Sequence, residues 1–183
     1  MTKLRVFESI SIDGYFTDAH DDIAWAHAGR EDPEFAAWVG GNASGGGALI
    51  FGRKTYEMMV AFWPTPAAAQ QLPEVAKGMN AAKKYVASRT IRPQWENTEL
   101  LQGDLVAAVR ALKRGDGPGL TVLGSGSVVA QLGEAGLVDE YMFVILPIAL
   151  GAGRTVFSTR CELRRVEQRA FDCGNVVVTY ATK

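Results

Sequence analysis

Three short segments of this sequence combine glycine, hydroxyl and arginine residues in the way that phosphate-binding sites do. They are Gly52-Arg53-Lys54-Thr55, Ser88-Arg89-Thr90 and Gly124-Ser125-Gly126-Ser127. A glycine-containing turn that opens a helix exposes backbone N–H groups, and the helix dipole adds to their attraction for a pyrophosphate. Guanidinium and hydroxyl groups bind phosphate oxygens directly. The three segments together therefore predict a site for a phosphorylated ligand.

The two arginines of these segments, Arg53 and Arg89, each follow a predicted strand, and each has a threonine or serine nearby. If both strands lie in one sheet, the guanidinium groups can converge on a monoester phosphate together with the hydroxyls of Ser88 and Thr90. Each charge-assisted hydrogen bond contributes about 1.5–3 kcal/mol, so two of them suffice to distinguish NADPH from NADH. Taken alone, either arginine is more typical of a solvated surface cation.

The segment that begins at Gly124 departs from the ordinary dinucleotide-binding fingerprint. The pattern G-x-G-x-x-G is not matched, because Val129 stands where the third glycine belongs. An ordinary Rossmann site is therefore disfavoured. A purely structural alternative is also open, in which the two glycines only make a tight turn between a strand and a helix.

The elements that must position these segments are short strands that alternate with helices. Apolar runs predict strands at residues 4–12, 48–51, 84–88, 120–123 and 140–146, and a closing hairpin at 163–170 and 176–181. Helix-capping residues predict helix starts after Asp32 and Asp104, and helical patterns also run to Phe62 and over 128–134. The glycine-rich stretch 40–47 is predicted to end the first helix, and 64–82 to form a loop with at most one short helix.

This order of elements predicts an α/β fold that covers residues 1–183 as one domain. Strands that alternate with helices form a mostly parallel sheet with helices on its faces, and the closing hairpin adds an antiparallel edge. Ligands bind such sheets beyond the carboxyl ends of the strands. The three phosphate-type segments are therefore expected along one edge of the sheet.

The composition argues against several other classes of protein. A net charge of −1 gives no overall field that would attract nucleic acid or an anionic membrane. The longest apolar segment, 141–150, is about half as long as a membrane span, and the N-terminus does not have the pattern of a signal peptide. We therefore expect a cytoplasmic protein.

His20 and His27 are isolated from other ligand-type residues, so no metal site is predicted.

Six motifs of this sequence follow one another in an order that resembles the order of motifs in a known family. They are Ser11-Ile12-Asp13-Gly14-Tyr15, Gly52-Arg53-Lys54-Thr55-Tyr56-Glu57, Ser88-Arg89-Thr90, Leu123-Gly124-Ser125-Gly126-Ser127, Leu137-Val138-Asp139-Glu140 and Pro147-Ile148-Ala149-Leu150-Gly151-Ala152-Gly153. The sequence resembles the dihydrofolate reductase-like superfamily over nearly its whole length. Within it, the similarity is to the C-terminal reductase domain of bacterial bifunctional riboflavin-biosynthesis deaminase-reductases.

The resemblance implies a three-layer dihydrofolate reductase-like fold and an NADPH-dependent oxidoreductase that transfers hydride to a C=N or C=O bond. By this similarity Arg53, Ser88 and Arg89 hold the 2′-phosphate of NADPH. The pyrophosphate lies on Gly124 to Ser127, and Thr55 faces the phosphate bridge. Many proteins of the riboflavin branch are dimers, so a homodimer is expected.

The resemblance leaves the substrate open between a 5-amino-6-(5-phosphoribosylamino)uracil-like pyrimidine and a pterin or dihydrofolate. Asp13 is the first candidate for orienting the substrate or relaying the proton, because it lies where the first strand opens into a loop, and Glu34 is the second. The alternative for Asp13 is an Asx-turn residue, and for Glu34 an ordinary acid at a helix N-terminus.

A planar substrate needs an aromatic pocket beside the cofactor. The predicted pocket residues are Gly14, Tyr15, Trp25, Trp38 and Phe62, and Trp63 is a further aromatic candidate. The alternative for most of these aromatic side chains is a place in the hydrophobic core. A second function also stays open, namely a non-catalytic NADP(H)-binding module that kept the phosphate site and lost the chemistry.

Overall fold

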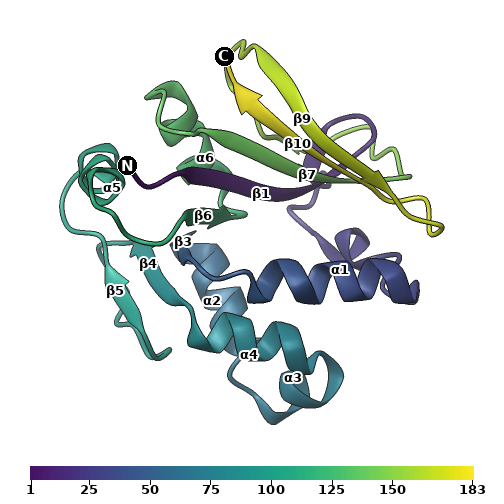
Figure 1. The fold of residues 1–183 in the computed structure, drawn as a ribbon, viewed down its shortest axis with the longest axis horizontal. Coiled ribbons are helices and arrows are strands. Elements are labelled where there is room, and N and C mark those ends of the chain that lie inside the picture. Colours follow the sequence, from purple (N-terminus) through teal and green to yellow (C-terminus); the bar gives the residue numbers. More distant parts are fainter.

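An eight-stranded sheet forms the centre of the computed structural model, which describes the backbone of residues 1–183 and every side chain except that of Ser44 (Figure 1). The strand order is β5-β4-β3-β6-β1-β7-β10-β9. A small second sheet pairs β2 with β8. The strands are β1 (Leu4–Ser11), β2 (Tyr15–Thr17), β3 (Ala48–Gly52), β4 (Lys83–Ala87), β5 (Thr98–Leu100), β6 (Leu120–Leu123), β7 (Glu140–Leu146), β8 (Arg154–Thr155), β9 (Leu163–Ala170) and β10 (Val176–Thr182).

The six strands from β5 to β7 run parallel, and the hairpin of β9 and β10 adds an antiparallel edge. The register places Val122 beside both Ile50 and Val6, and all three side chains are completely buried. Branched side chains of this kind pack well on a pleated surface that is covered by helices. The fold class predicted from the sequence is confirmed.

Helices cover both faces of the sheet (Figure 1). On one face, Phe35 of α1 packs against Val144, and Tyr56 of α2 and Met79 of α4 pack around Phe51. Helices α5 and α6 cover the opposite face. The helices are the 3-10 helix η1 (Ala24–His27) and the α-helices α1 (Pro33–Ser44), α2 (Arg53–Phe62), α3 (Pro66–Gln71), α4 (Pro73–Ala81), α5 (Leu105–Arg114) and α6 (Gly126–Glu134).

The segment 64–82 differs from its prediction as a loop with at most one short helix, because it forms two helices, α3 and α4. Each begins with a proline, and Thr65 caps the first. Helix α1 also continues beyond its predicted end, through two glycines, to Ser44. A Cβ built on Gly40 would make an ordinary van der Waals contact of 3.7 Å with Cβ of Glu74, so α1 packs against α4 at this glycine. Tertiary packing there outweighs the low helix propensity of glycine.

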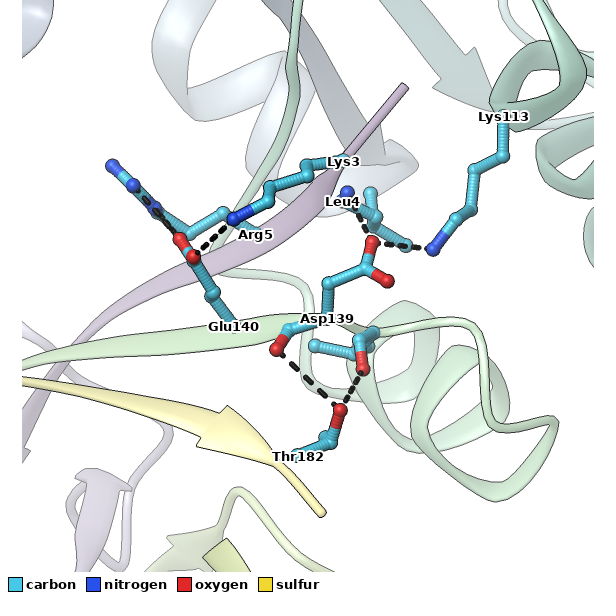
Figure 2. Close-up of polar contacts among 8 residues, drawn as sticks. Lys3, Leu4, Arg5, Lys113, Asp139, Glu140 and Thr182 are labelled. Atoms are coloured by element: carbon cyan, nitrogen blue, oxygen red, sulfur yellow. Dashed lines mark hydrogen bonds and ion pairs between the residues drawn. The ribbon is translucent and has the colours of Figure 1, made fainter. Parts of the chain in front are cut away.

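A polar network ties the strands together at the amino end of the parallel sheet (Figure 2). The Asp139 carboxylate accepts a hydrogen bond of 2.7 Å from the Leu4 backbone N–H and forms an ion pair with Lys113. Glu140 binds the Arg5 guanidinium at 2.9 Å. The motif around Asp139 therefore has a structural role, because it connects β1, β7 and α5 at the edge opposite the phosphate-type segments.

Lys84 is completely buried on β4. Its ammonium donates hydrogen bonds to the backbone oxygens of Ala82 (2.7 Å), Asn80 (3.0 Å) and Glu96 (3.2 Å), and it lies 4.4 Å from the centre of the Trp95 ring. These contacts satisfy all three N–H donors of the ammonium group. The side chain thereby joins the end of α4 to the segment that leads into β5.

Among the helices of the part of the chain described here, none has both the length and the apolar character needed to cross a membrane.

Candidate functional site

A cleft of about 1510 Å³ opens at the carboxyl ends of the central parallel strands and extends along the sheet beneath α1. The residues predicted to hold a phosphorylated cofactor, far apart in the sequence, all line this one cleft. They are Gly52, Arg53, Thr55, Ser88, Arg89, Thr90, Gly124, Ser125, Gly126 and Ser127. The structure therefore brings together the three segments that the sequence singled out.

The sheet topology explains why the segments meet. Strand β3 lies between β4 and β6 and runs parallel to both, with Ala48 in register with Lys83 on one side and Leu120 on the other. Parallel strands in register end at the same edge of the sheet. The residues that follow β3, β4 and β6 therefore emerge side by side.

Ser125 holds two of the three segments in place. Its hydroxyl accepts a hydrogen bond of 2.7 Å from the Gly52 backbone N–H and donates one of 2.7 Å to the Thr55 hydroxyl. The residue adopts a left-handed backbone conformation, with φ of 68°. The Ser125 side chain is thus engaged in joining the β3–α2 junction to the turn before α6, and its backbone begins that helix.

Two helices open into the cleft without a side-chain cap. The N-cap residue is Gly52 for α2 and Ser125 for α6, and in neither helix does a side chain accept a hydrogen bond from the first turn. Helix α4 also has no side-chain cap, but its N-cap residue is the apolar Leu72. By contrast, Asp32, Thr65 and Asp104 cap α1, α3 and α5. The first-turn N–H groups of a helix have no partner within it, and together with the helix dipole they attract anions. A phosphate group fits both positions.

Positive side chains dominate the cleft although the whole chain carries a net charge of −1. The acidic side chains at the cleft are Glu8, Asp21 and Asp104. Asp21 is partly neutralised by Arg154 at 3.5 Å. The cationic side chains of lysine and arginine at the cleft are Arg5, Arg30, Arg53, Lys54, Lys83, Arg89 and Arg154. A local excess of positive charge in a concave site favours an anionic ligand.

The two predicted phosphate-binding arginines keep their charges accessible. Arg53 lies 3.8 Å from Glu57 one helical turn away, and both side chains are about half exposed. Within the described part of the chain Arg89 has no ion pair. Beside it, the Ser88 hydroxyl accepts long hydrogen bonds from the backbone N–H groups of Thr90 (3.3 Å) and Ile91 (3.4 Å), which shapes the turn.

Glu8 is a cleft residue that the sequence predictions missed. It lies on β1, half-buried, and a Cβ built on Gly124 would be 3.9 Å from one of its carboxylate oxygens. Burial raises the pKa of Glu8 to about 8, although the Ser9 backbone lowers it slightly. The sequence carried a signal, because Glu8 follows Leu4 and Val6 at the alternate, inward-facing positions of a strand.

The pocket walls also include apolar side chains, and Trp63 is the one of them that the sequence offered as a candidate. Phe16 is buried beside the start of α6, and a Cβ built on Gly126 would lie only 2.3 Å from the end of its ring. Glycine is therefore required at position 126 for this close approach. Phe7, Met59 and Trp63 also line the cleft.

Asp13 does not lie among the cleft residues, and its carboxylate is occupied elsewhere. It accepts hydrogen bonds from the Ser11 hydroxyl (2.6 Å) and from the backbone N–H groups of Leu150 (3.1 Å) and Gly151 (2.8 Å). These bonds, that of Ser11 foremost, lower the pKa of Asp13 to about 2. An ionised carboxylate of this kind braces two loops, as the turn-stabilising alternative expects, and the catalytic role of Asp13 stays a prediction.

Glu34 also lies outside the cleft, at the exposed start of α1, where it forms an ion pair with Arg169 of β9. The predicted pocket residues Gly14, Tyr15, Trp25, Trp38 and Phe62 are likewise not among the residues that line the cleft. Trp25 and Trp38 pack instead around Phe35 on the face of the sheet beneath α1, and Phe62 packs edge-on against Trp63. The core alternative thus fits the two tryptophans, because α1 turns Trp38 toward β7 and β10 and η1 brings Trp25 against the same cluster.

Comparison with known proteins identifies the class to which this fold and cleft belong. The family model described as the RibD C-terminal domain matches residues 2–177, and the chain belongs to this family. The resemblance noted in the sequence is thereby confirmed. A curated relative, the uncharacterised protein YyaP of Bacillus subtilis (strain 168), is 25% identical over 175 residues, which cover 94% of this chain and 90% of the relative.

Solved structures share the fold. A candidate riboflavin biosynthesis protein from Shewanella sp. PV-4 superposes with a TM-score of 0.72 at 22% identity, covering 100% of this chain and 99% of its own. A pyrimidine reductase-like protein from Corynebacterium diphtheriae gives 0.62 at 14% identity, covering 100% and 92%. Acinetobacter baumannii RibD gives 0.65 at 13% identity, and the match covers 100% of this chain and 58% of that protein.

Proposed function

We propose that this protein is an NADPH-dependent reductase that holds the phosphates of its cofactor at the carboxyl ends of β3, β4 and β6. The observation that carries the proposal is the convergence of Arg53, Arg89 and two uncapped helix starts on one positively charged cleft. Membership of the RibD C-terminal domain family and the likeness to a pyrimidine reductase-like protein support a reductase.

The residues of the cleft fit the parts of a dinucleotide phosphate. The first-turn N–H groups of α6, after Gly124 and Ser125, suit the pyrophosphate, and Thr55 lies against the same turn. The Arg53 and Arg89 guanidiniums suit a 2′-phosphate monoester, because each can form two parallel hydrogen bonds with phosphate oxygens. A bound NADPH supplies a hydride to an acceptor carbon.

The remainder of the cleft suits a small planar substrate that stacks beside the cofactor. Its side walls include the apolar residues Phe7, Phe16 and Trp63, which exclude water from the reacting atoms. Arg30 and His27 lie at the same cleft and can bind an anionic or carbonyl group. We propose a heterocyclic substrate of the pyrimidine or pterin type, reduced at a C=N or C=O bond.

Equilibrium titrations with NADPH and NADH test the cofactor proposal, with the fluorescence of Trp63 as a reporter inside the cleft. Arg53→Ala or Arg89→Ala should each weaken NADPH binding by about tenfold or more, because each removes charge-assisted hydrogen bonds to one phosphate. Both variants should leave NADH binding nearly unchanged. Arg164→Ala is the matched control, since Arg164 is an exposed cation of β9 outside the cleft.

Two outcomes would contradict parts of this proposal. An equal loss of NADPH and NADH affinity in the arginine variants would show that these side chains do not read the 2′-phosphate. NADPH binding without NADPH oxidation across dihydrofolate, pterin and pyrimidine substrates would favour the non-catalytic binding module.

A further inference from the structure

Glu8 places a carboxyl group where the proposed phosphate-binding turn meets β1. One carboxylate oxygen would be 3.9 Å from a Cβ built on Gly124, and the same turn contacts Thr55 of α2. The residue is on the inward-facing side of its strand, next to the fully buried Val6. A charged side chain at such a position is unusual, because burial of an unpaired carboxylate is costly.

Glu8 has no structural partner of the kind that the other acids of the cleft possess. Asp21 forms ion pairs with Lys54 and Arg154, and the Asp104 carboxylate caps α5. Among the described residues, no side chain forms an ion pair or hydrogen bond with Glu8. In the same part of the chain, the one polar group that affects its pKa is the Ser9 backbone, which lowers it. The carboxyl group is therefore available to a ligand that enters the cleft.

The charge state of Glu8 decides whether it can share this place with a phosphate. A carboxylate beside the turn would repel the pyrophosphate, whereas a neutral carboxyl has an O–H that donates a hydrogen bond. Burial raises the pKa of Glu8 to about 8, so the group is mostly neutral at pH 7. The environment thus favours the form that is compatible with an anionic ligand.

We propose that Glu8 binds the dinucleotide in its neutral form, donating a hydrogen bond to an oxygen of the ligand beside Gly124, so that binding is coupled to protonation of this side chain. The inference rests on the proposed function, since it assumes that the cleft takes a dinucleotide. It adds a ligand-binding residue on β1 to the three segments that follow β3, β4 and β6.

Proton uptake on NADPH binding measures this coupling directly. Isothermal titration calorimetry in buffers of different ionisation enthalpy should show uptake that rises toward about one proton per NADPH near pH 9, where free Glu8 is ionised. The dissociation constant should increase about tenfold per pH unit above pH 8. Glu8→Gln keeps a neutral hydrogen-bond donor, so it should bind NADPH with little pH dependence and without this proton uptake.

The comparison of wild type with Glu8→Gln isolates one side chain from the other charges nearby. The other charged or titratable side chains that line the cleft are Arg5, Asp21, His27, Arg30, Arg53, Lys54, Lys83, Arg89, Asp104 and Arg154. All of them are present in both proteins. Asp21→Asn is the matched control, because it removes a negative charge from the same cleft and should retain the proton uptake of the wild type.

Lys84 titrates in the same pH range, because burial lowers its pKa to about 8. Its ammonium is enclosed by backbone oxygens between α4 and β5, and Lys84 itself does not line the cleft, although its acceptor Ala82 does. Any contribution from Lys84 is common to wild type and Glu8→Gln. It therefore cancels from the difference between them.

The possible results separate this inference from the function on which it rests. NADPH binding by the wild type without proton uptake between about pH 8 and pH 9.5 would overturn the role of Glu8 and leave the cofactor site standing. Equal uptake in wild type and Glu8→Gln would do the same. No binding of NADPH at pH 7, where Glu8 is mostly neutral, would overturn both.

Discussion

Glu8 lies on β1 and Asp13 in the turn that follows this strand, yet their surroundings shift their pKa values in opposite directions. A hydroxyl and two backbone N–H groups hold Asp13 ionised, with a pKa of about 2, whereas burial raises that of Glu8 to about 8. Environments that separate two carboxyl groups in this way assign them different tasks. Asp13 braces loops, and Glu8 holds a proton at the cleft.

The sequence could predict which arginines and glycines line the cleft but not the surroundings of these two acids. Arg53, Arg89 and Gly124 follow strands, and the edge at which parallel strands end is fixed by topology. The environment of a carboxylate depends on contacts between distant segments, such as that of Asp13 with Gly151. Those contacts have no local signature in the sequence.

The raised pKa of Glu8 predicts how stability depends on pH. Because the folded protein holds this proton more tightly than the unfolded chain, the wild type should lose stability as pH rises from about 4.5 to about 8. Glu8→Gln is always neutral and lacks this loss. The melting temperature of Glu8→Gln relative to wild type should therefore increase across that range and level off above it, as measured by circular dichroism. Parallel curves would show that Glu8 is not held neutral.

At the scale of elements, the start of α6 depends on a close contact with β2. Gly126→Ala places a methyl group against Phe16, which must move because a Cβ there would lie 2.3 Å from its ring. We expect a loss of about 1–3 kcal/mol in the free energy of unfolding and weaker NADPH binding, since the helix start shifts. Urea denaturation and fluorescence titration measure the two effects.

A double-mutant cycle with Phe16→Ala checks the origin of that loss. Removing the ring should make Gly126→Ala less costly, with a coupling of about 0.5 kcal/mol or more. Gly41→Ala in α1 is the control, because a Cβ there meets nothing within 4 Å. It should stabilise the protein by about 0.5–1 kcal/mol. An unchanged cost of Gly126→Ala in the absence of the ring would contradict the steric explanation.

Elements with strong local signals were predicted well, and elements that depend on packing were not. Asp32 and Asp104 cap their helices as expected, and the closing hairpin forms. The strand β5 is only three residues long and contains Glu99, so its sequence gave no periodic pattern. Helix α4 is held by the burial of Val75 and Met79 against α1 and the sheet, which sequence alone does not reveal.

At the scale of the whole molecule, the two ends of the parallel sheet have separate roles. The amino end carries the network of Asp139 with Lys113 and the Leu4 backbone (Figure 2), and the carboxyl end carries the cleft. Asp139→Ala should lower the free energy of unfolding by about 2 kcal/mol, because it leaves the Leu4 backbone N–H without an acceptor and the mostly enclosed Lys113 ammonium with the Leu137 backbone oxygen alone. Its affinity for NADPH should stay close to that of the wild type.

Glu162→Ala is the control for this prediction, since Glu162 pairs with Arg160 and Lys183 at the exposed surface. Exposed ion pairs contribute about 0–1 kcal/mol, so this variant should be nearly as stable as the wild type. Chemical denaturation measures the stability of both variants, and fluorescence titration their affinity. A loss of NADPH affinity in folded Asp139→Ala would contradict the separation of the two ends.

The central claim is that three segments following β3, β4 and β6 form one cofactor site. Hydrogen–deuterium exchange with and without NADPH tests it most directly, because it reports on the backbone amides themselves. The prediction is slower exchange in residues 52–55, 88–90 and 124–127 together when NADPH is present. Protection confined to one segment, or found only outside the cleft, would contradict it.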